Sequence, residues 1–383
     1  MSKTAPTSGR SASIGSLPRG LTSWFRVARR GGFRAALLGL AAASMVLALY
    51  GGLARLGVPL PQLARLESLH GPLMICGVFG TLISLERAVA IGLTWPYTAP
   101  ACFGLAALLM ISGWSLEAAA VLTVVAAAAF LAASNWIVFR QPALFTAVLL
   151  VGAAMLFIGC TLWLSGMEVR ALVGWWLGFL VCTIGAERLE LSRIMRPGTA
   201  SKCLFGGIVA LIVIGAALGL DSEYGAGVLG AGLLGTALWL ARYDVATRTI
   251  RMSGQSRFMA AAMLAGYLWV AVSGLVLLLT PGAAFAYDLT LHALLIGFVL
   301  SMVFGHALII FPAVTGVVLK YSRALYVPLA LLHLSVLVRV LGDLLELWDV
   351  RLASGPVTAV ALVLFAATTA TGRKAPAQRT ASR

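Results

Sequence analysis

Residues 286–312 read AYDLTLHALLIGFVLSMVFGHALIIFP, and this stretch decides the fold class of the chain. Nearly every residue in it is apolar, and it is longer than the roughly 20 residues that cross the hydrocarbon core of a bilayer as a helix. A backbone in lipid must satisfy its own hydrogen bonds, so a spanning segment of this kind is helical. The stretch is therefore a membrane-spanning helix that carries two imidazoles, His292 and His306.

Apolar stretches of similar length recur along the whole chain. Of the 383 residues, 61% are hydrophobic and 11% are charged, and the mean hydropathy is +0.98. The apolar residues show no alternation with a period of two, which argues against an outer-membrane barrel. The sequence predicts an all-α polytopic membrane protein with about 12 transmembrane helices. Their predicted ranges are 34–56, 68–91, 97–114, 116–138, 143–165, 170–192, 202–220, 224–242, 257–280, 286–312, 322–344 and 352–371.

The net charge of +15 follows the predicted membrane topology. When the N-terminus is assigned to the cytoplasm, most of the 28 lysines and arginines fall on the cytoplasmic side, as the positive-inside rule requires. The exceptions in segments on the outer side are Arg55, Arg65, Arg170 and Arg351. We therefore predict a multi-pass membrane protein with both termini in the cytoplasm. Membrane lipid is then the implied partner, and the basicity calls for no nucleic acid.

The predicted spans form one uninterrupted domain, residues 34–371. Residues 1–33 are rich in Ser, Gly and Arg and lack the apolar core and cleavage site of a signal peptide. We expect a disordered basic cytoplasmic tail there, touching anionic lipid through Trp24 and Phe25, and a similar tail at residues 372–383. The five cysteines form no CxxC pair, so they predict apolar packing residues rather than a disulfide framework.

All four histidines lie inside predicted spans. An imidazole in lipid is costly unless it binds something, so such residues are functional candidates. His70 lies within about one turn of the outer end of its span, and His292 lies about 9 Å into the span that starts at residue 286. The two imidazoles can therefore reach the same depth on different helices. A heme iron held by two histidines requires that arrangement.

Three further polar residues lie inside the last spans. Arg339, near the outer end of its span, either pairs with a heme propionate or extends to the interface, and both interpretations stay open. His306 follows His292 by fourteen residues, about four turns, and so lies on the same helix face about 20 Å nearer the cytoplasm. His306 and mid-membrane His333 form a second metal site, a proton or electron path, or structural bonds to carbonyls. No catalytic residue is identified. The candidate metal ligands are His70, His292, His306 and His333.

Two similar charged motifs end two of the spans on the cytoplasmic side. They are Leu85-Glu86-Arg87-Ala88 and Ala186-Glu187-Arg188-Leu189, about four spans apart. Three sets of four helices would place spans 2, 6 and 10 in equivalent positions, although a Glu-Arg pair at a helix end is common. The charges form either interhelical ion pairs or a site of proton uptake.

Twelve spans with histidines near the outer ends of spans 2 and 10 resemble subunit I of the heme-copper oxidases. The segment His292-Ala-Leu-Leu-Ile-Gly297, continuing to Gly305 and Val314-Thr315-Gly316, is similar to the NnrS family of bacterial heme- and copper-associated membrane proteins linked to nitric oxide metabolism. The resemblance implies a location in the bacterial inner membrane, three four-helix arcs and a low-spin heme b. Its ligands would be His292 and His70, the latter in Leu69-His70-Gly71-Pro72-Leu73-Met74. It also leaves room for a further metal, copper.

The chain departs from both families in its histidines. Spans 6 and 7 contain none, whereas an oxidase needs histidines there to hold copper. Span 2 has one histidine instead of the His-Ala-His-Glu pattern of NnrS proteins. Oxygen reduction is therefore not expected. We expect electron transfer, or redox or nitric-oxide-related chemistry, with an unknown redox partner. Whether the protein is an enzyme, and its oligomeric state, stay open. The alternatives are a proton-coupled transporter without a cofactor and a structural or assembly subunit.

Overall fold

The computed structural model describes residues 31–61 and 63–371. Within these ranges the chain contains no β-strand, and twelve helices are long and apolar enough to cross a membrane. The predicted all-α polytopic fold is confirmed. The predicted tails at 1–33 and 372–383 lie outside the described residues, except that residues 31–33 form the start of the first span.

The observed helices agree with the predicted ranges to within a few residues. Several spans combine a long α-helix with a short 3-10 or π-helical segment. The elements are α2 (Gly31–Leu56); α3 (Ala64–Pro72), η1 (Leu73–Gly80) and α4 (Thr81–Ile91); η2 (Trp95–Tyr97) and α5 (Thr98–Ser112); α6 (Leu116–Arg140); α7 (Leu144–Leu164); α8 (Val169–Leu191) and η3 (Ser192–Met195); α9 (Thr199–Leu218); α10 (Glu223–Tyr243); α11 (Ala246–Thr249); α12 (Gly254–Leu279); α13 (Ala286–His292), η4 (Ala293–Leu300) and α14 (Ser301–Thr315); η5 (Arg323–Leu325) and α15 (Tyr326–Leu344); and α16 (Trp348–Thr371).

Local sequence signals explain where several helices start and stop. The Ser115 side chain caps α6 by accepting a hydrogen bond from the Ala118 amide at 3.1 Å, which satisfies one of the free amides of a first helical turn. Gly92 and Gly316 follow α4 and α14 in the left-handed conformation, with φ of 73° and 76°. Glycine adopts this conformation without steric cost, so it ends helices readily.

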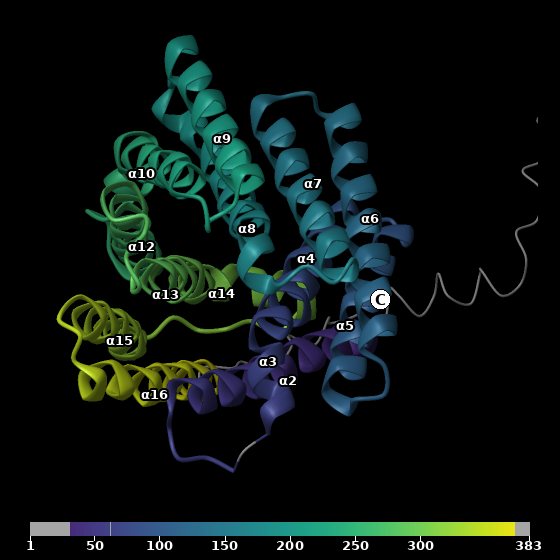
Figure 1. Ribbon diagram of the computed structural model, residues 1–383. Coiled ribbons are helices and arrows are strands. Elements are labelled where there is room, and N and C mark those ends of the chain that lie inside the picture. The colour runs from purple at the N-terminus through teal and green to yellow at the C-terminus, as the bar shows by residue number, and fades with distance from the viewer. Residues whose placement is uncertain (1–30, 62, 372–383) are drawn as a thin grey trace, which may run out of the picture.

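The helices follow one another around a ring in chain order, and α16 returns to pack against α2 (Figure 1). Spans 2, 6, 8 and 10 lie toward the inside, with 56%, 72%, 56% and 56% of their apolar windows buried, whereas α16 buries 17%. The inner position brings the histidines of spans 2 and 10 within the bundle.

Candidate functional site

Two adjoining cavities lie between spans 1, 2, 10, 11 and 12 at one end of the bundle, and the larger one is also lined by span 6. Their volumes are about 80 Å³ and 190 Å³, and His70, His292 and Arg339 line both of them. His70 comes from α3, His292 from the end of α13 and Arg339 from α15. The structure therefore brings together the three residues that the sequence predicted to bind a cofactor.

Both imidazoles are held by the backbone through the same nitrogen. His70 Nδ1 lies 2.6 Å from the carbonyl oxygen of Ala48 in α2, and His292 Nδ1 lies 2.8 Å from the carbonyl oxygen of Asp288 in α13. A carbonyl can only accept, so Nδ1 of each ring carries the proton and Nε2 keeps its lone pair. No described residue hydrogen-bonds to either Nε2. Metal-binding histidines are oriented in this way, with one nitrogen donating to the protein and the other free for the metal.

Each of these histidines stands next to an eight-residue π-helical segment. The segment η1 begins at Leu73, shortly after His70, and η4 begins at Ala293, directly after His292. Wide turns of this kind are rare and frequent at functional sites. Gly52 of α2 leaves space for the His70 ring, because a Cβ at residue 52 would lie 2.7 Å from the Cε1 atom of the ring. The local backbone is therefore shaped around the histidines.

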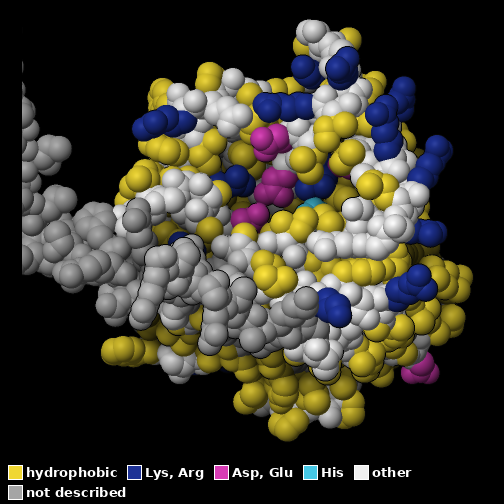
Figure 2. Space-filling view, turned by 180° about the vertical axis from the view of Figure 1, so that it is seen from behind, with side chains coloured by type: hydrophobic (Ala, Val, Ile, Leu, Met, Phe, Trp, Pro, Cys, Tyr) yellow, Lys and Arg dark blue, Asp and Glu magenta, His cyan; other side chains and the backbone are white. Residues whose placement is uncertain are grey.

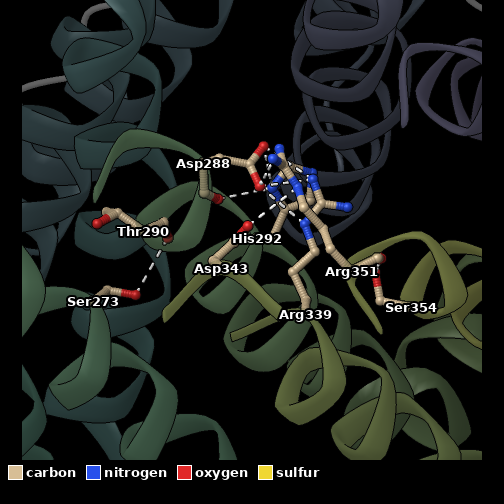
Figure 3. A network of polar contacts seen from close by, with 8 residues as sticks. All are labelled: Ser273, Asp288, Thr290, His292, Arg339, Asp343, Arg351 and Ser354. Atoms are coloured by element: carbon tan, nitrogen blue, oxygen red, sulfur yellow. Dashed lines mark hydrogen bonds and ion pairs between the residues drawn. The ribbon is translucent and has the colours of Figure 1, made fainter. Parts of the chain in front are cut away.

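A network of ion pairs lies beside His292 (Figure 3). The carboxylate of Asp288 accepts hydrogen bonds from Arg339 Nε and Nη2 at 2.7–2.9 Å, and Arg351 Nη2 lies 3.2 Å from the same carboxylate. Arg351 also pairs with Asp343, Nε to Oδ1 at 3.1 Å. Arg339 is thus neither alone nor turned to the interface, because it ties span 11 to span 10.

Asp288, Asp343 and Arg351 were missed as site residues in the sequence. A signal for Asp288 was present, because an acid inside a membrane span is rare and usually paired. It also precedes His292 by four residues, so both side chains lie on one helix face. For Arg351 no comparable signal exists, since it reads as an ordinary arginine at a helix end.

His333 has both ring nitrogens engaged by protein groups. Trp269 Nε1 donates to Nδ1 at 2.9 Å, so Nε2 carries the proton and faces Ser301 Oγ at 3.3 Å. The Ser301 hydroxyl in turn donates to the carbonyl of Ala262 at 2.7 Å. His333 therefore links spans 9, 10 and 11 as a structural residue. A structural role was one of the interpretations that the sequence left open for His333, beside metal binding.

His306 lies toward the other end of the bundle from His292. Its Nδ1 lies 2.8 Å from the carbonyl oxygen of Met302, and its buried Nε2 has no hydrogen-bond partner among the described residues. Buried Arg188 interacts electrostatically both with His306 and with Asp244, whose side chain is fully enclosed. Asp244 follows α10, outside the spans, and burial raises the pKa of its carboxyl group even though the Ala246 amide and Arg188 oppose this.

The two charged motifs at the ends of spans 2 and 6 meet in the structure. Arg87 Nη2 lies 3.4 Å from Glu187 Oε1, and Glu86 interacts electrostatically with Glu187. An interhelical ion pair therefore exists, as one of the two interpretations of these motifs predicted. Figure 2 shows acidic side chains gathered in a hollow on the face opposite to that of Figure 1, with lysine and arginine side chains around them.

The donor set at the two cavities is limited to two imidazoles. Among the described residues no group of three or more His, Cys, Asp or Glu side chains could hold a metal ion. The nearest carboxylate, that of Asp288, is occupied by Arg339 and Arg351. A bare metal ion would find too few protein ligands here. A metal whose other ligands come from a macrocycle needs only the two axial positions.

Fold and site define an all-α multi-pass membrane protein in which two histidines line the same pair of cavities. A family model described as "Domain of unknown function (DUF8744)" matches residues 34–373. The chain therefore belongs to the DUF8744 family. No curated protein matches it.

Proposed function

We propose that this protein is a bacterial inner-membrane heme protein in which His70 and His292 are the axial ligands of one heme b. The observation that carries the proposal is the shared geometry of the two imidazoles. Each donates Nδ1–H to a backbone carbonyl, keeps Nε2 open and lines the same pair of cavities. The proposed relationship to the NnrS family or to heme-copper oxidase subunit I rests on the same two positions.

Charge at the site supports the proposal as well. Arg339 and Arg351 present two guanidinium groups to one Asp288 carboxylate. A heme carries two propionates, and guanidinium groups bind carboxylates in a planar, two-pronged geometry. In the proposed complex Arg339 and Arg351 hold one propionate each while Asp288 keeps the backbone contact to His292.

The cavities are small, so the proposal requires side chains to move when heme binds. Their volumes are below the roughly 300–1,000 Å³ that is typical of cofactor pockets. Met74 and Leu295 line both cavities and are flexible apolar side chains. We expect these two side chains to move aside when a porphyrin binds between α3 and α13.

The proposed function is electron transfer or redox sensing, with nitric oxide binding as a variant. A bound heme supplies one-electron oxidation and reduction. Two protein ligands leave no open position on the iron, which favours electron transfer over substrate turnover. For copper, the second metal that the resemblance implies, the described residues outside the proposed heme site offer one open imidazole nitrogen, His306 Nε2. Metal analysis of the purified protein tests it.

An absorption spectrum tests the heme proposal directly. The full chain is expressed in heme-replete cells, purified in mild detergent and measured oxidised and after reduction with dithionite. We expect a Soret band with sharp α and β bands, and about one heme per chain by the pyridine hemochrome assay. The variants His70→Ala and His292→Ala should each lose most of the heme, while His306→Ala should retain it.

Two results would count against the proposal. A folded, monodisperse but colourless wild-type protein would remove the cofactor. A spectrum unaffected by both His70→Ala and His292→Ala would place any heme elsewhere. Size-exclusion chromatography of each variant separates loss of heme from loss of fold.

A second candidate function, a proton-coupled transporter without a cofactor, is favoured by the opposite end of the bundle. Acidic and basic side chains meet there in a hollow (Figure 2). Buried Arg188, Asp244 and His306 have side-chain atoms that lack hydrogen-bond partners among the described residues. A colourless protein whose reconstituted vesicles take up protons with a co-substrate would support this function. A purely structural or assembly subunit would show neither property.

Localisation in the bacterial inner membrane, with both termini in the cytoplasm, is part of the proposal. The twelve spans support a multi-pass membrane protein, and the arginine distribution supports the orientation. Fusing a reporter that is active only in the cytoplasm to either end tests the orientation.

A further inference from the structure

A third cavity, separate from the histidine site, lies at the end of the bundle that the arginine distribution assigns to the cytoplasm. Its volume is about 490 Å³. It is formed where α8 ends, η3 turns and α9 begins, against the start of α7. Its floor is apolar and is made by Leu144, Phe145 and Leu189.

Three cationic side chains surround this floor. Arg193, Arg196 and Lys202 all line the cavity, and no acidic residue does. Among the residues that the structure describes, none of the three forms an ion pair. The guanidinium carbon of Arg193 lies 5.1 Å from the centre of the Phe145 ring, which holds this cation over the apolar floor. The cavity therefore has positive charge that no described protein group neutralises.

The backbone adds to this positive charge. The helix α9 begins after Gly198 without a side-chain cap and without an acidic residue in its first turn. The free amides of a first turn carry partial positive charge and attract anions. Arg196 adopts the left-handed conformation, with φ 52°, which is uncommon for a residue other than glycine. Its turn connects the segment that carries Arg193 to the helix that carries Lys202.

We propose that this cavity binds the phosphodiester headgroup of an anionic phospholipid. Arg193, Arg196, Lys202 and the first turn of α9 contact the phosphate, and Phe145 packs against the glycerol backbone. Basic cavities between transmembrane helices on the cytoplasmic side suit such headgroups. Ile194 and Leu204, on the segments flanking the cavity, are 62% and 60% exposed. Acyl chains running into the bilayer from the headgroup cover these two side chains.

Lipid binding by the full chain tests the proposal without reference to heme. The protein is stripped of lipid in detergent and titrated with cardiolipin, phosphatidylglycerol or phosphatidylcholine, and bound lipid is counted by native mass spectrometry. We expect cardiolipin and phosphatidylglycerol to bind more tightly than phosphatidylcholine. Each basic side chain near a membrane surface contributes about fivefold in affinity. The double variant Arg193→Gln/Lys202→Gln should therefore weaken cardiolipin binding by roughly 30-fold.

A matched double variant separates this cavity from general surface charge. Arg248 and Arg251 are exposed, lie between α10 and α12 on the same side, and do not line the cavity. Arg248→Gln/Arg251→Gln removes the same charge and should change cardiolipin binding less than about twofold. Equal weakening by both double variants, or equal binding of phosphatidylcholine, would overturn the proposal.

Two further arms keep the test decisive. If the double variant does not fold, Arg193→Gln alone should weaken binding about fivefold and Arg193→Lys should restore it. Equal binding by these two single variants would contradict a role for the charge. Inorganic phosphate at millimolar concentration should not displace the lipid, because the acyl chains contribute to affinity. Displacement by phosphate would show that the cavity takes a free anion instead.

Discussion

Asp288 and Arg339 form a bidentate ion pair between spans 10 and 11, with Arg339 Nε to Oδ2 and Nη2 to Oδ1 both at 2.9 Å. The backbone carbonyl of the same Asp288 accepts the hydrogen bond from His292 Nδ1 at 2.8 Å. One residue thus holds the imidazole with its main chain and the arginine with its side chain. The position of Arg339 and the orientation of His292 are mechanically linked through α13.

The ion pair should stabilise the fold. Arg339 and Asp288 side chains are 10% and 25% exposed, and removing one partner of a largely buried pair leaves an uncompensated charge. Because Arg351 still contacts Asp288, we expect Arg339→Gln to lower the free energy of unfolding by about 2–3 kcal/mol. The melting temperature in detergent measures it. The control is Arg170→Gln, whose pair with Asp221 is 57% and 54% exposed and contributes less than about 1 kcal/mol. Equal losses in both variants would contradict the prediction.

Gly52 should tolerate no side chain as long as His70 keeps its present orientation. A Cβ at residue 52 would lie 2.7 Å from Cε1 and 2.8 Å from Nδ1 of His70. Gly52→Ala must therefore displace the ring and break its bond to Ala48, which should cost about 1–3 kcal/mol and reduce the heme content of the purified protein. Gly39→Ala, in the same helix α2, is the matched control. A Cβ there would meet no neighbouring side chain within 4 Å, and we expect no loss of stability and unchanged heme content.

Trp269 should matter through its indole nitrogen. Trp269→Phe keeps the ring packing but removes the donor to His333 Nδ1, which leaves a partly buried acceptor without a partner. We expect a loss of about 1–2 kcal/mol in the free energy of unfolding with the absorption spectrum unchanged, because His333 is not an axial ligand in the proposed site. Trp114→Phe, at a tryptophan that is 86% exposed, should have no measurable effect. A changed heme spectrum in Trp269→Phe would mean that His333 acts on the iron.

Asp244 should give the protein a pH-dependent stability that one substitution removes. Burial raises the pKa of its carboxyl group, so the folded state holds this proton at a pH where the unfolded chain, with an ordinary value near 4, has released it. Stability therefore falls as pH rises from about 4 through the raised folded pKa. In Asp244→Asn the Ala246 amide keeps an acceptor oxygen, and this part of the pH dependence should vanish. The difference in melting temperature between the two proteins, plotted against pH, measures it. A difference in melting temperature that stays constant across this pH range would contradict the prediction.

The membrane architecture was predictable from the sequence because it depends on local composition. Twenty apolar residues in lipid have one stable backbone solution, whatever the rest of the chain does. The range predicted as 116–138 was observed as Leu116–Arg140, and that predicted as 286–312 as Ala286–Thr315. The position of His70 and His292 at one end of their spans followed from counting residues along those helices.

The candidate site was predictable only in part. His70, His292 and Arg339 were predicted together and do line common cavities. Asp288 and Arg351 were missed, because the partner of a charged side chain depends on which helices are neighbours. The π-helical segments after the two histidines were missed too, since the local sequence of a π-turn resembles that of an α-helix.

By itself the sequence determined the number of spans, their approximate ends, the orientation that the arginines favour and the depth of each histidine. These properties follow from hydrophobicity and from the fixed rise of a helix. Only the tertiary structure decided which nitrogen of each imidazole is free and that Arg339 is bound to Asp288. It also decided that His333 is held by Trp269 and Ser301. Those contacts join residues 32 to 64 positions apart, and such distant partners meet only through the packing of whole helices.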